Sequence, residues 1–322
     1  MARLAPPQAL ALGALRVRPL FSILIPHRDD LKGLIRTLEA LSRLSPSSPS
    51  HEVVVADNGS VCGPDSVRKA VDSACRVQAH LILQPHLGAG LARNAAVDSA
   101  RGQFLAFLDC DCVPEPDWLL QAHAALGKSP IVGGPVVVRP EPGELNAAQT
   151  FDMLFGFNSK LSFERDGLLL SANLIVEQGA FRQIGPFRIG VSEDREWCLR
   201  ASRMGFPLVL VPTLAVAHFA LGCRHRLFAR WRRITVETYQ FQRFEGRGAV
   251  AWLLYLVAVA GSPFWHWTRI FSDPRLGNCH LGMRMKTVLL LFRLRFARVF
   301  WGLSELLRTG RPKRTRGSAR WA

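Results

Sequence analysis

The chain has 322 residues, of which 48% are hydrophobic and 20% are charged, and this balance excludes a disordered chain and a chain wholly embedded in a membrane. The length allows one large domain with an appendage. The net charge of +16 is confined to one part: residues 1–217 carry 21 basic and 21 acidic side chains, whereas residues 218–322 carry 20 and 4. The basic part predicts an anionic surface as its partner.

The first half of the chain alternates between strand and helix patterns after an irregular leader, rich in Ala, Leu and Pro, at 1–20. Apolar runs that end in turn residues predict buried strands, and apolar residues at helical spacing predict helices. In chain order we expect a strand at 21–26, a helix at 31–44, strands at 53–57 and 79–83 on either side of a helix at 67–75, a helix at 88–100 with Gly102 as its C-terminal cap, and a strand at 104–108. Such alternation predicts a parallel sheet with right-handed crossovers.

The second half predicts shorter elements and then a change of character. Strands are expected at 136–138, 168–176 and 208–211, and helices at 178–184 and 194–204. Residues 249–267 form a stretch of 19 without a charge, close to the roughly 20 that span a bilayer. Gly261, Pro263 and His266 weaken its second half, so a spanning helix, a buried helix and a re-entrant segment all stay open.

A second apolar helix is expected at 288–307, where Arg293, Arg295 and Arg298 do not share one face. This pattern favours an interfacial helix whose arginines extend toward lipid headgroups. The seven cysteines show no C-x-x-C pair, which predicts reduced thiols in the cytoplasm.

Acidic residues follow two of the predicted strands. Asp109 and Asp111 come directly after the strand at 104–108, and Asp57 ends the strand at 53–57. Parallel sheets bind their ligands at the edge formed by the carboxyl ends of their strands, and paired carboxylates suit Mg²⁺ or Mn²⁺ that bridges phosphate oxygens. Arg93, on the intervening helix, is either a cation aimed at phosphate or a surface arginine, and the acidic pair is either a metal site or a solvated turn.

Several motifs in order and spacing resemble family 2 glycosyltransferases: Ile23–Pro26, Val54–Ser60, Leu91–Ala96, Phe107–Asp111, Cys112–Leu119 and Ser192–Arg200. The resemblance covers about residues 21 to 218. It implies an α/β GT-A fold with a mostly parallel central sheet at 21–217, which transfers sugar from a nucleotide diphosphate with inversion. Residues 218–322 would then be a basic, helical, membrane-associating region.

The resemblance also implies roles for individual residues. Pro26 and Asp57 would frame the nucleoside, Asp109 and Asp111 would be the D-x-D pair that holds the metal and diphosphate, and Asp194 would be the general base beside Glu193. An inverting displacement needs such a carboxylate opposite the leaving diphosphate. By sequence alone, Glu193-Asp194 also fits an ordinary acidic helix N-terminus.

Two further positions carry weaker resemblances. His218 stands where related GT-A enzymes can supply another metal ligand. Leu227-Phe228-Ala229-Arg230-Trp231 resembles the Q-x-x-R-W motif of processive members, but leucine replaces glutamine, which favours transfer of a single sugar. Arg230 would pair with the donor diphosphate.

We therefore expect a non-processive, inverting glycosyltransferase on the cytoplasmic face of the cell membrane. It would use Mg²⁺ or Mn²⁺, a nucleotide-diphosphate sugar and a hydroxyl acceptor that is lipid-linked or close to the membrane. The alternatives are a nucleic-acid-binding protein and an inactive GT-A-like binding protein. Apolar runs within the basic third favour a membrane over nucleic acid, and the intact D-x-D with Glu193-Asp194 favours an enzyme.

Overall fold

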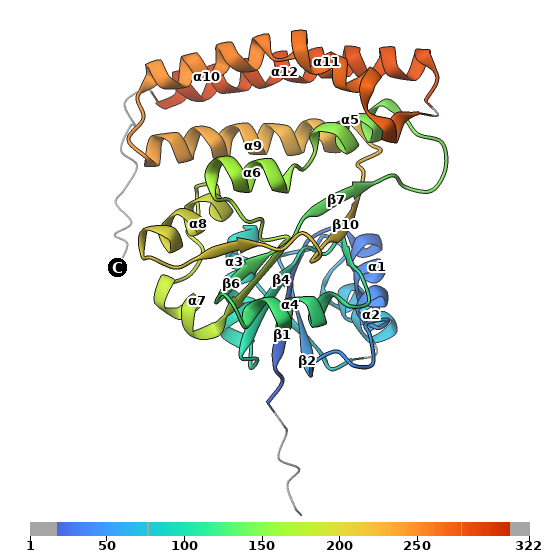
Figure 1. The fold of residues 1–322 in the computed structure, drawn as a ribbon, viewed down its shortest axis with the longest axis vertical. Coiled ribbons are helices and arrows are strands. Elements are labelled where there is room, and N and C mark those ends of the chain that lie inside the picture. The colour runs from blue at the N-terminus through green and yellow to red at the C-terminus, as the bar shows by residue number, and fades with distance from the viewer. Residues whose placement is uncertain (1–17, 76, 278, 310–322) are drawn as a thin grey trace, which may run out of the picture.

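The computed structural model describes residues 18–75, 77–277 and 279–309, so most of the expected leader and the end of the basic tail lie outside the described residues. Two parts are stacked on one another (Figure 1). A sheet flanked by helices forms the lower part in that view. A layer of long helices lies across its upper end.

The central sheet has seven strands in the order β3-β2-β1-β4-β8-β6-β9. The first four of these pair in parallel, as do β6 and β9, whereas β8 runs antiparallel to both of its neighbours. The predicted mostly parallel sheet is therefore confirmed. The strand bounds are β1 Phe21–His27, β2 His51–Asp57, β3 Ala79–Leu83, β4 Phe104–Leu108, β6 Ile131–Gly133, β8 Asn173–Glu177 and β9 Leu208–Leu210.

Helices cover both faces of the sheet because alternate side chains of the buried strands point to opposite sides. Ile23 and Ile25 of β1 pack with the helices α1, α2 and α4, whereas Leu24 packs with α3, α7 and α8. These helices are α1 Leu31–Leu41, α2 Pro64–Ala74, α3 Ala89–Ser99, α4 Trp118–Leu126, α7 Gln178–Ile184 and α8 Glu193–Arg203.

A second sheet of three short strands was not predicted, since three or four residues carry too little periodicity. It comprises β5 Cys112–Pro114, β10 Val216–Phe219 and β7 Val136–Arg139. β10 pairs antiparallel with β5 so that His218 lies opposite Cys112, which brings the histidine beside the D-x-D segment. The boundary expected between 217 and 218 falls inside β10.

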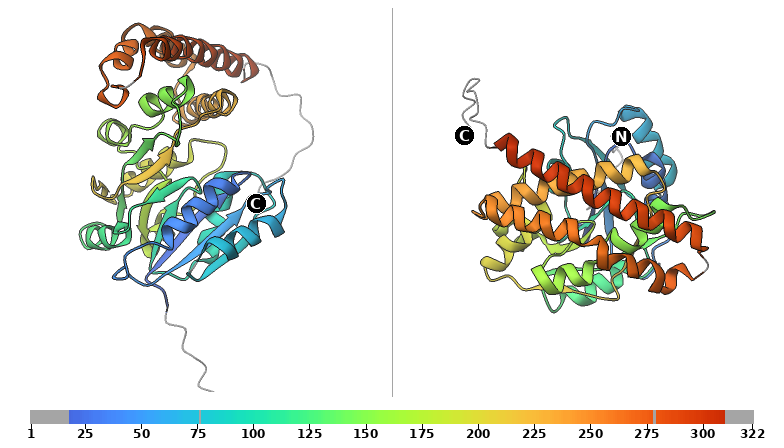
Figure 2. Two further views of the ribbon diagram at one scale, coloured as in Figure 1. Left: turned by 90° about the vertical axis from the view of Figure 1, so that its right-hand side faces the viewer. Right: turned by 90° about the horizontal axis from the view of Figure 1, so that it is seen from above.

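The helical layer has its own core. α5 (Ala147–Phe155), α9 (Arg224–Phe244), α11 (Pro263–Ser272) and α12 (Leu281–Thr309) share one hydrophobic cluster that includes Phe151, Trp231 and Leu291. α6 (Ser159–Asp166) and α10 (Ala249–Gly261) complete this part of the fold. α12 crosses over α9 when the molecule is seen from above (Figure 2). α9 therefore separates the outer helices from the sheet domain.

The uncharged stretch at 249–267 is not one straight helix. α10 and α11 meet at Ser262 with a bend of 42°. Among the described residues, no single helix has both the length and the apolar composition to cross a bilayer, although this bent pair does when taken together.

Three expectations about local structure were wrong. Gly102 is no helix cap: α3 ends in an extended Ala100, and Gly102 instead allows close approach to β1, since a Cβ there would lie 2.5 Å from Ser22 N. Residues 168–172 form a loop before β8, closed by a turn in which Asn173 N–H donates to Leu170 O at 2.9 Å. This loop lines the pocket described below.

The third correction concerns the arginines of α12. Arg295 and Arg298 are only 7% and 5% exposed and point into the helical layer rather than toward headgroups, whereas Arg293 is exposed. Arg298 donates to Thr235 Oγ1 at 3.2 Å and to the Tyr255 hydroxyl at 2.6 Å, and its guanidinium lies 4.7 Å from the centre of the Trp231 ring. Hydrogen bonds and a cation–π contact thus replace the water that Arg298 loses, whereas Arg295 has cation–π contacts with Phe155 and Trp231 and a buried Nε without a hydrogen-bond partner.

Candidate active site

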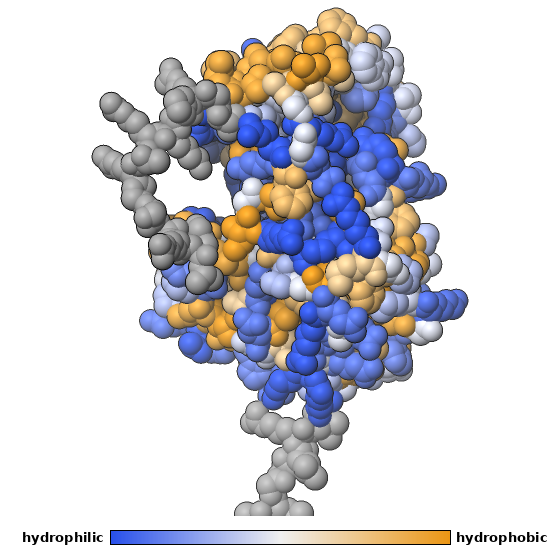
Figure 3. Space-filling model, turned by 90° about the vertical axis from the view of Figure 1, so that its left-hand side faces the viewer, coloured by the Kyte–Doolittle hydropathy of each residue, from blue (hydrophilic) through white to orange (hydrophobic). Residues whose placement is uncertain are grey.

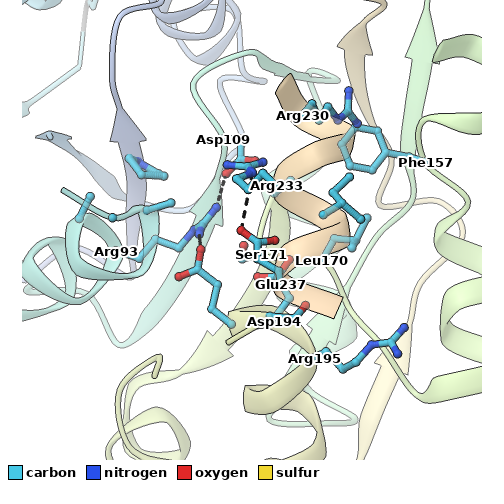
Figure 4. A pocket seen from close by; sticks show the side chains of 18 of the residues that line it. Arg93, Asp109, Phe157, Leu170, Ser171, Asp194, Arg195, Arg230, Arg233 and Glu237 are labelled. Carbon is cyan, nitrogen blue, oxygen red and sulfur yellow. Dashed lines mark hydrogen bonds and ion pairs between the residues drawn. The ribbon is translucent and has the colours of Figure 1, made fainter. Parts of the chain in front are cut away.

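A cavity of about 790 Å³ opens where β1, β2 and β4 end, and α9 forms its opposite wall (Figure 4). The sheet contributes the residues that follow its strands, and the loop before β8, the start of α8 and one face of α9 complete the lining. The polar and charged residues of the lining include His27, Arg28, Asn58, Arg93, Asp109, Asp111, Ser171, Glu193, Asp194, Arg195, Arg230, Arg233 and Glu237. The predicted edge of the sheet thus holds the pocket.

Arg93 is the centre of an ion-pair network in this pocket. Its Nη2 donates to Asp109 Oδ1 at 2.7 Å and its Nη1 donates to Glu193 Oε1 at 3.0 Å, although only 6% of its side chain is exposed. Burial disfavours the charged guanidinium, but Asp109, Glu193 and Asp194 outweigh this and raise the pKa of Arg93. Arg93 therefore joins the D-x-D segment to the start of α8, and it is not a surface arginine.

Gly90 leaves room for the Glu193 carboxylate beside Arg93. A Cβ at position 90 would overlap with Glu193 Oε2. Burial, with Asp194, Glu237 and Asp109 nearby, raises the pKa of Glu193 to about 7, although Arg93 opposes this shift. One buried cation is thus shared among several carboxylates, which makes this end of the pocket rich in hydrogen-bond acceptors.

Asp194 lies in the first turn of α8 and points into the pocket (Figure 4). Its Oδ1 is buried and has no hydrogen-bond partner, while Ser171 from the loop before β8 bonds to the carboxylate. Burial raises the pKa of Asp194, and Arg93 and Ser171 only partly offset it. A desolvated carboxylate with a free oxygen is well suited to accept a proton.

Asp111 and His218 meet on the other side of Asp109. Asp111 Oδ2 lies 3.0 Å from His218 Nε2. Burial would raise the pKa of Asp111, but His218 and Arg230 hold it below its ordinary value. The small sheet is what brings these residues together across 107 positions of sequence.

A divalent cation would fit this carboxylate and imidazole. Mn²⁺ accepts both types of ligand, and such ions commonly complete their shell with water and substrate phosphate. In the described part of the chain, no group of three or more His, Cys, Asp or Glu side chains is arranged as a metal site. Asp109 is turned to Arg93, so Asp111 and His218 are the residues that would hold the ion.

Arg230 and Trp231 lie on different faces of α9, about 100° apart. Arg230 lines the pocket, donates from Nη1 to Asp152 at 3.2 Å and lies 4.3 Å from the centre of the Phe157 ring. Its Nη2 is buried without a partner. Trp231 is 8% exposed and packs edge-on against Phe151 in the helical layer. Only the arginine of this pair is placed to meet a ligand in the pocket.

Asp57 does not line the pocket. It is 3% exposed, and its Oδ1 lies 3.0 Å from His27 Nδ1 and accepts a hydrogen bond from Ser60 at 2.5 Å. Pro26, His27 and the neighbouring Asn58 line the cavity instead. Asp57 thus braces the segment after β1, and a direct contact of its carboxylate with a nucleoside stays a prediction.

Cys110, between the two aspartates, carries a neutral thiol. Burial, together with Asp111, Asp109 and Asp30, raises its pKa well above the ordinary value. All seven cysteines are free, and their reduced state in the cytoplasm stays a prediction.

The sequence analysis missed Ser171, Asp152 and Glu237. Ser171 lies in a segment predicted as strand, and Asp152 on α5 and Glu237 on α9 lie outside the motifs of the sequence. In α9 the pocket residues recur at 230, 233, 234, 237 and 238, a helical spacing that marks one face without revealing what it faces.

Comparison with known proteins agrees with the fold and the motifs. The model of glycosyl transferase family 2 matches residues 22–184. Glycosyltransferase AglE of Haloferax volcanii is 29% identical over 210 residues, which cover 64% of this chain and 66% of that protein. The pre-mycofactocin glycosyltransferase of Mycobacterium tuberculosis is 29% identical over 212 residues, 61% of this chain and 42% of that protein. The chain thus spans less than two thirds of the length of these relatives.

Solved structures show the same fold. The mannosyltransferase PcManGT from Pyrobaculum calidifontis, solved with GDP-Man and Mn²⁺, superimposes with a TM-score of 0.55 at 15% identity over 92% of this chain and 77% of that chain. S. aureus TarS 1-349 in complex with UDP-GlcNAc superimposes with a TM-score of 0.50 at 18% identity over 91% of this chain and 93% of that chain. The α/β fold with its mixed, mostly parallel sheet is the GT-A fold, and the chain belongs to glycosyltransferase family 2.

Proposed function

We propose that this protein is an inverting, non-processive glycosyltransferase that moves one sugar from a nucleotide diphosphate to a hydroxyl group. The observation that carries the proposal is the position of Asp194, whose buried, unpartnered Oδ1 faces the same pocket as Asp111 and Arg230. A proton acceptor and a diphosphate site thus share one cavity, as a single displacement requires.

In the proposed reaction, Asp194 takes the proton of the acceptor hydroxyl, whose oxygen attacks the anomeric carbon. The bond from that carbon to the diphosphate breaks, and the nucleoside diphosphate leaves with the bonding electrons. Arg230 donates to the diphosphate through its free Nη2. A bound divalent cation, held by Asp111 and His218, would neutralise charge on the diphosphate. Arg93 keeps Asp109 and Glu193 in place.

The donor is a nucleotide sugar of a kind that related proteins bind. GDP-Man and UDP-GlcNAc occur in the structures of PcManGT and TarS, and Mn²⁺ in the former. Leucine at position 227 and the burial of Trp231 support transfer of a single sugar, since the processive motif is incomplete and its tryptophan lies outside the pocket.

The outer helices support a place at a membrane. Large apolar side chains are exposed along α10, α11 and α12, and hydrophobic atoms gather at the top of the molecule (Figure 3): Val250, Leu253, Leu254, Val257, Phe264, Trp265, Trp267, Phe271, Leu281, Met285, Leu289, Phe296, Phe300, Leu303 and Leu307. Soluble monomers rarely expose so much apolar surface together. We propose that this surface, with basic residues such as Lys286 and Arg293, lies on the anionic cytoplasmic face of the cell membrane, near a lipid-linked acceptor.

The test is the variant Asp194→Asn, with donors screened as UDP-, GDP- and dTDP-sugars. Transfer should fall roughly 100- to 10,000-fold because the amide cannot accept a proton, while the Kd for the nucleotide sugar in calorimetry stays near the wild-type value. Asp98→Asn, an exposed aspartate on α3, is the matched control and should keep full activity. Unchanged turnover in Asp194→Asn would remove this residue from the mechanism.

A further inference from the structure

Glu237 is a charged pocket residue that the proposed reaction leaves without a role. It lies on α9, two turns after Arg230, on the face that lines the cavity. Another face of α9, about a third of a turn away, is fixed in the helical layer by buried Leu227, Trp231 and Thr235. The direction of Glu237 into the pocket therefore follows from the packing of α9.

The carboxylate of Glu237 lacks a close partner. Its ion pair with Arg233 spans 3.7 Å, longer than a hydrogen bond, and 65% of the Arg233 side chain is exposed. The described residues provide no hydrogen bond to Glu237. Burial raises the pKa of Glu237, and Asp194 adds to this rise, so the two carboxylates act on each other electrostatically.

The cations around this pair have other partners. Arg93 is hydrogen-bonded to Asp109 and Glu193. Arg195 donates to Asp166 at 2.8 Å and points away from the pocket centre (Figure 4). Asp194 from α8 and Glu237 from α9 therefore line the same cavity with free acceptor oxygens: Asp194 Oδ1 is buried, and 36% of the Glu237 side chain is exposed. A ligand that contacts both carboxylates is best matched if it supplies a hydrogen-bond donor to each.

The lining near these carboxylates is also partly apolar. Leu168 and Leu170 come from the loop that carries Ser171, and Ile234 comes from the turn of α9 before Glu237. A sugar ring presents hydroxyl groups at its edge and C–H groups on its faces, which matches such a mixed lining. A monohydric alcohol would satisfy only one of the two carboxylates.

We infer that Glu237 binds the acceptor by accepting a hydrogen bond from a hydroxyl next to the one that Asp194 deprotonates, and that the acceptor is therefore a sugar residue with neighbouring hydroxyl groups. Glu237 takes no proton and forms no bond in the transfer; it orients the ring so that one hydroxyl faces Asp194. The inference rests on the proposed function and names the acceptor class for that site.

The test compares octyl β-D-glucopyranoside, octyl β-D-galactopyranoside and octyl α-D-mannopyranoside with 1-octanol, which has the same chain but one hydroxyl. Wild-type enzyme should transfer to at least one glycoside and at least about tenfold less efficiently to 1-octanol. Glu237→Gln and Glu237→Ala should raise the KM for that glycoside about tenfold or more, the cost of one charge-assisted hydrogen bond, with a smaller change in kcat.

Donor hydrolysis without acceptor separates this role from a structural one, and should stay within about twofold of wild type in both variants. Glu164→Gln, an exposed glutamate on α6, is the matched control. An unchanged acceptor KM in both Glu237 variants, wild-type use of 1-octanol as efficiently as of glycosides, or no use of any of the glycosides overturns the inference. Full activity of Asp194→Asn, or no turnover of any donor, instead overturns the proposed function and the inference with it.

Discussion

Replacing Arg93 by Met tests whether the ion-pair network holds the pocket together. Methionine fills similar space but leaves Asp109 and Glu193 without their shared cation. Removing one partner of a buried pair costs about 3–5 kcal/mol, but 32% of the Asp109 side chain and 25% of the Glu193 side chain stay exposed, so water solvates them in part. We therefore expect the free energy of unfolding to fall by about 2–3 kcal/mol, which is less than the cost for a fully buried pair.

Thermal unfolding measures this loss. For 322 residues, an unfolding entropy of about 2.1 cal/mol/K per residue converts a loss of about 2–3 kcal/mol into a decrease in Tm of about 3–4 °C. Arg68→Met, at an exposed position of α2, is the control and should leave Tm unchanged. The triple variant Arg93→Met, Asp109→Asn, Glu193→Gln should recover part of the loss because no unpaired charge remains. A wild-type Tm in Arg93→Met, or no recovery in the triple variant, would refute the reasoning.

The remaining predictions concern catalysis and surface binding. Burial raises the pKa of Asp194, and this residue must be ionised to act as the base. As the pH is lowered, kcat should therefore begin to fall at a pH above about 3.9, the pKa of an exposed aspartate. A pH–rate profile without such an acid limb contradicts this prediction. Chelation with EDTA should abolish transfer, and His218→Gln should raise the Mn²⁺ concentration for half-maximal activity at least about tenfold; full activity after exhaustive chelation would exclude the metal role of Asp111. The double variant Leu254→Asp, Val257→Asp, on α10, should no longer float with phosphatidylserine vesicles, whereas the control Val61→Asp in the sheet domain should. Equal flotation of all variants, or tighter binding to DNA than to vesicles at the same salt, counts against the membrane surface.

Much of the sheet domain could be predicted because its strands are buried on both faces. The runs at 104–108 and 79–83 match β4 and β3 in their bounds, since an apolar run that ends in Asp or Gln marks the end of a buried strand. Asp109 and Asp111 follow the end of β4, Asp194 was predicted from the family resemblance of residues 192–200, and the structure brings all three to one pocket. For these three aspartates, the local sequence pattern is enough to predict that the side chain lies in the site.

The rest depends on contacts that no local pattern contains. Glu237 shares a pocket with Asp194 because α9 crosses the carboxyl edge of the sheet, and Ser171 lines that pocket because a turn delays the start of β8 to Asn173. Arg295 and Arg298 resemble interfacial arginines in sequence, yet Trp231, Thr235 and Tyr255 from other helices enclose them. Their burial is a property of the helix packing, which the sequence of α12 alone does not determine.

α9 has one face in the pocket and the other in the helical layer, and this constrains how the protein can evolve. A substitution at Trp231 or Thr235 that shifts the helix also shifts Arg230 and Glu237 relative to Asp194. Mutations that adapt the outer helices to a different surface and move α9 therefore also change which molecules fit the pocket. Lineages that change one without compensating in the other should lose activity, so we expect substitutions on the two faces of α9 to be accepted in pairs.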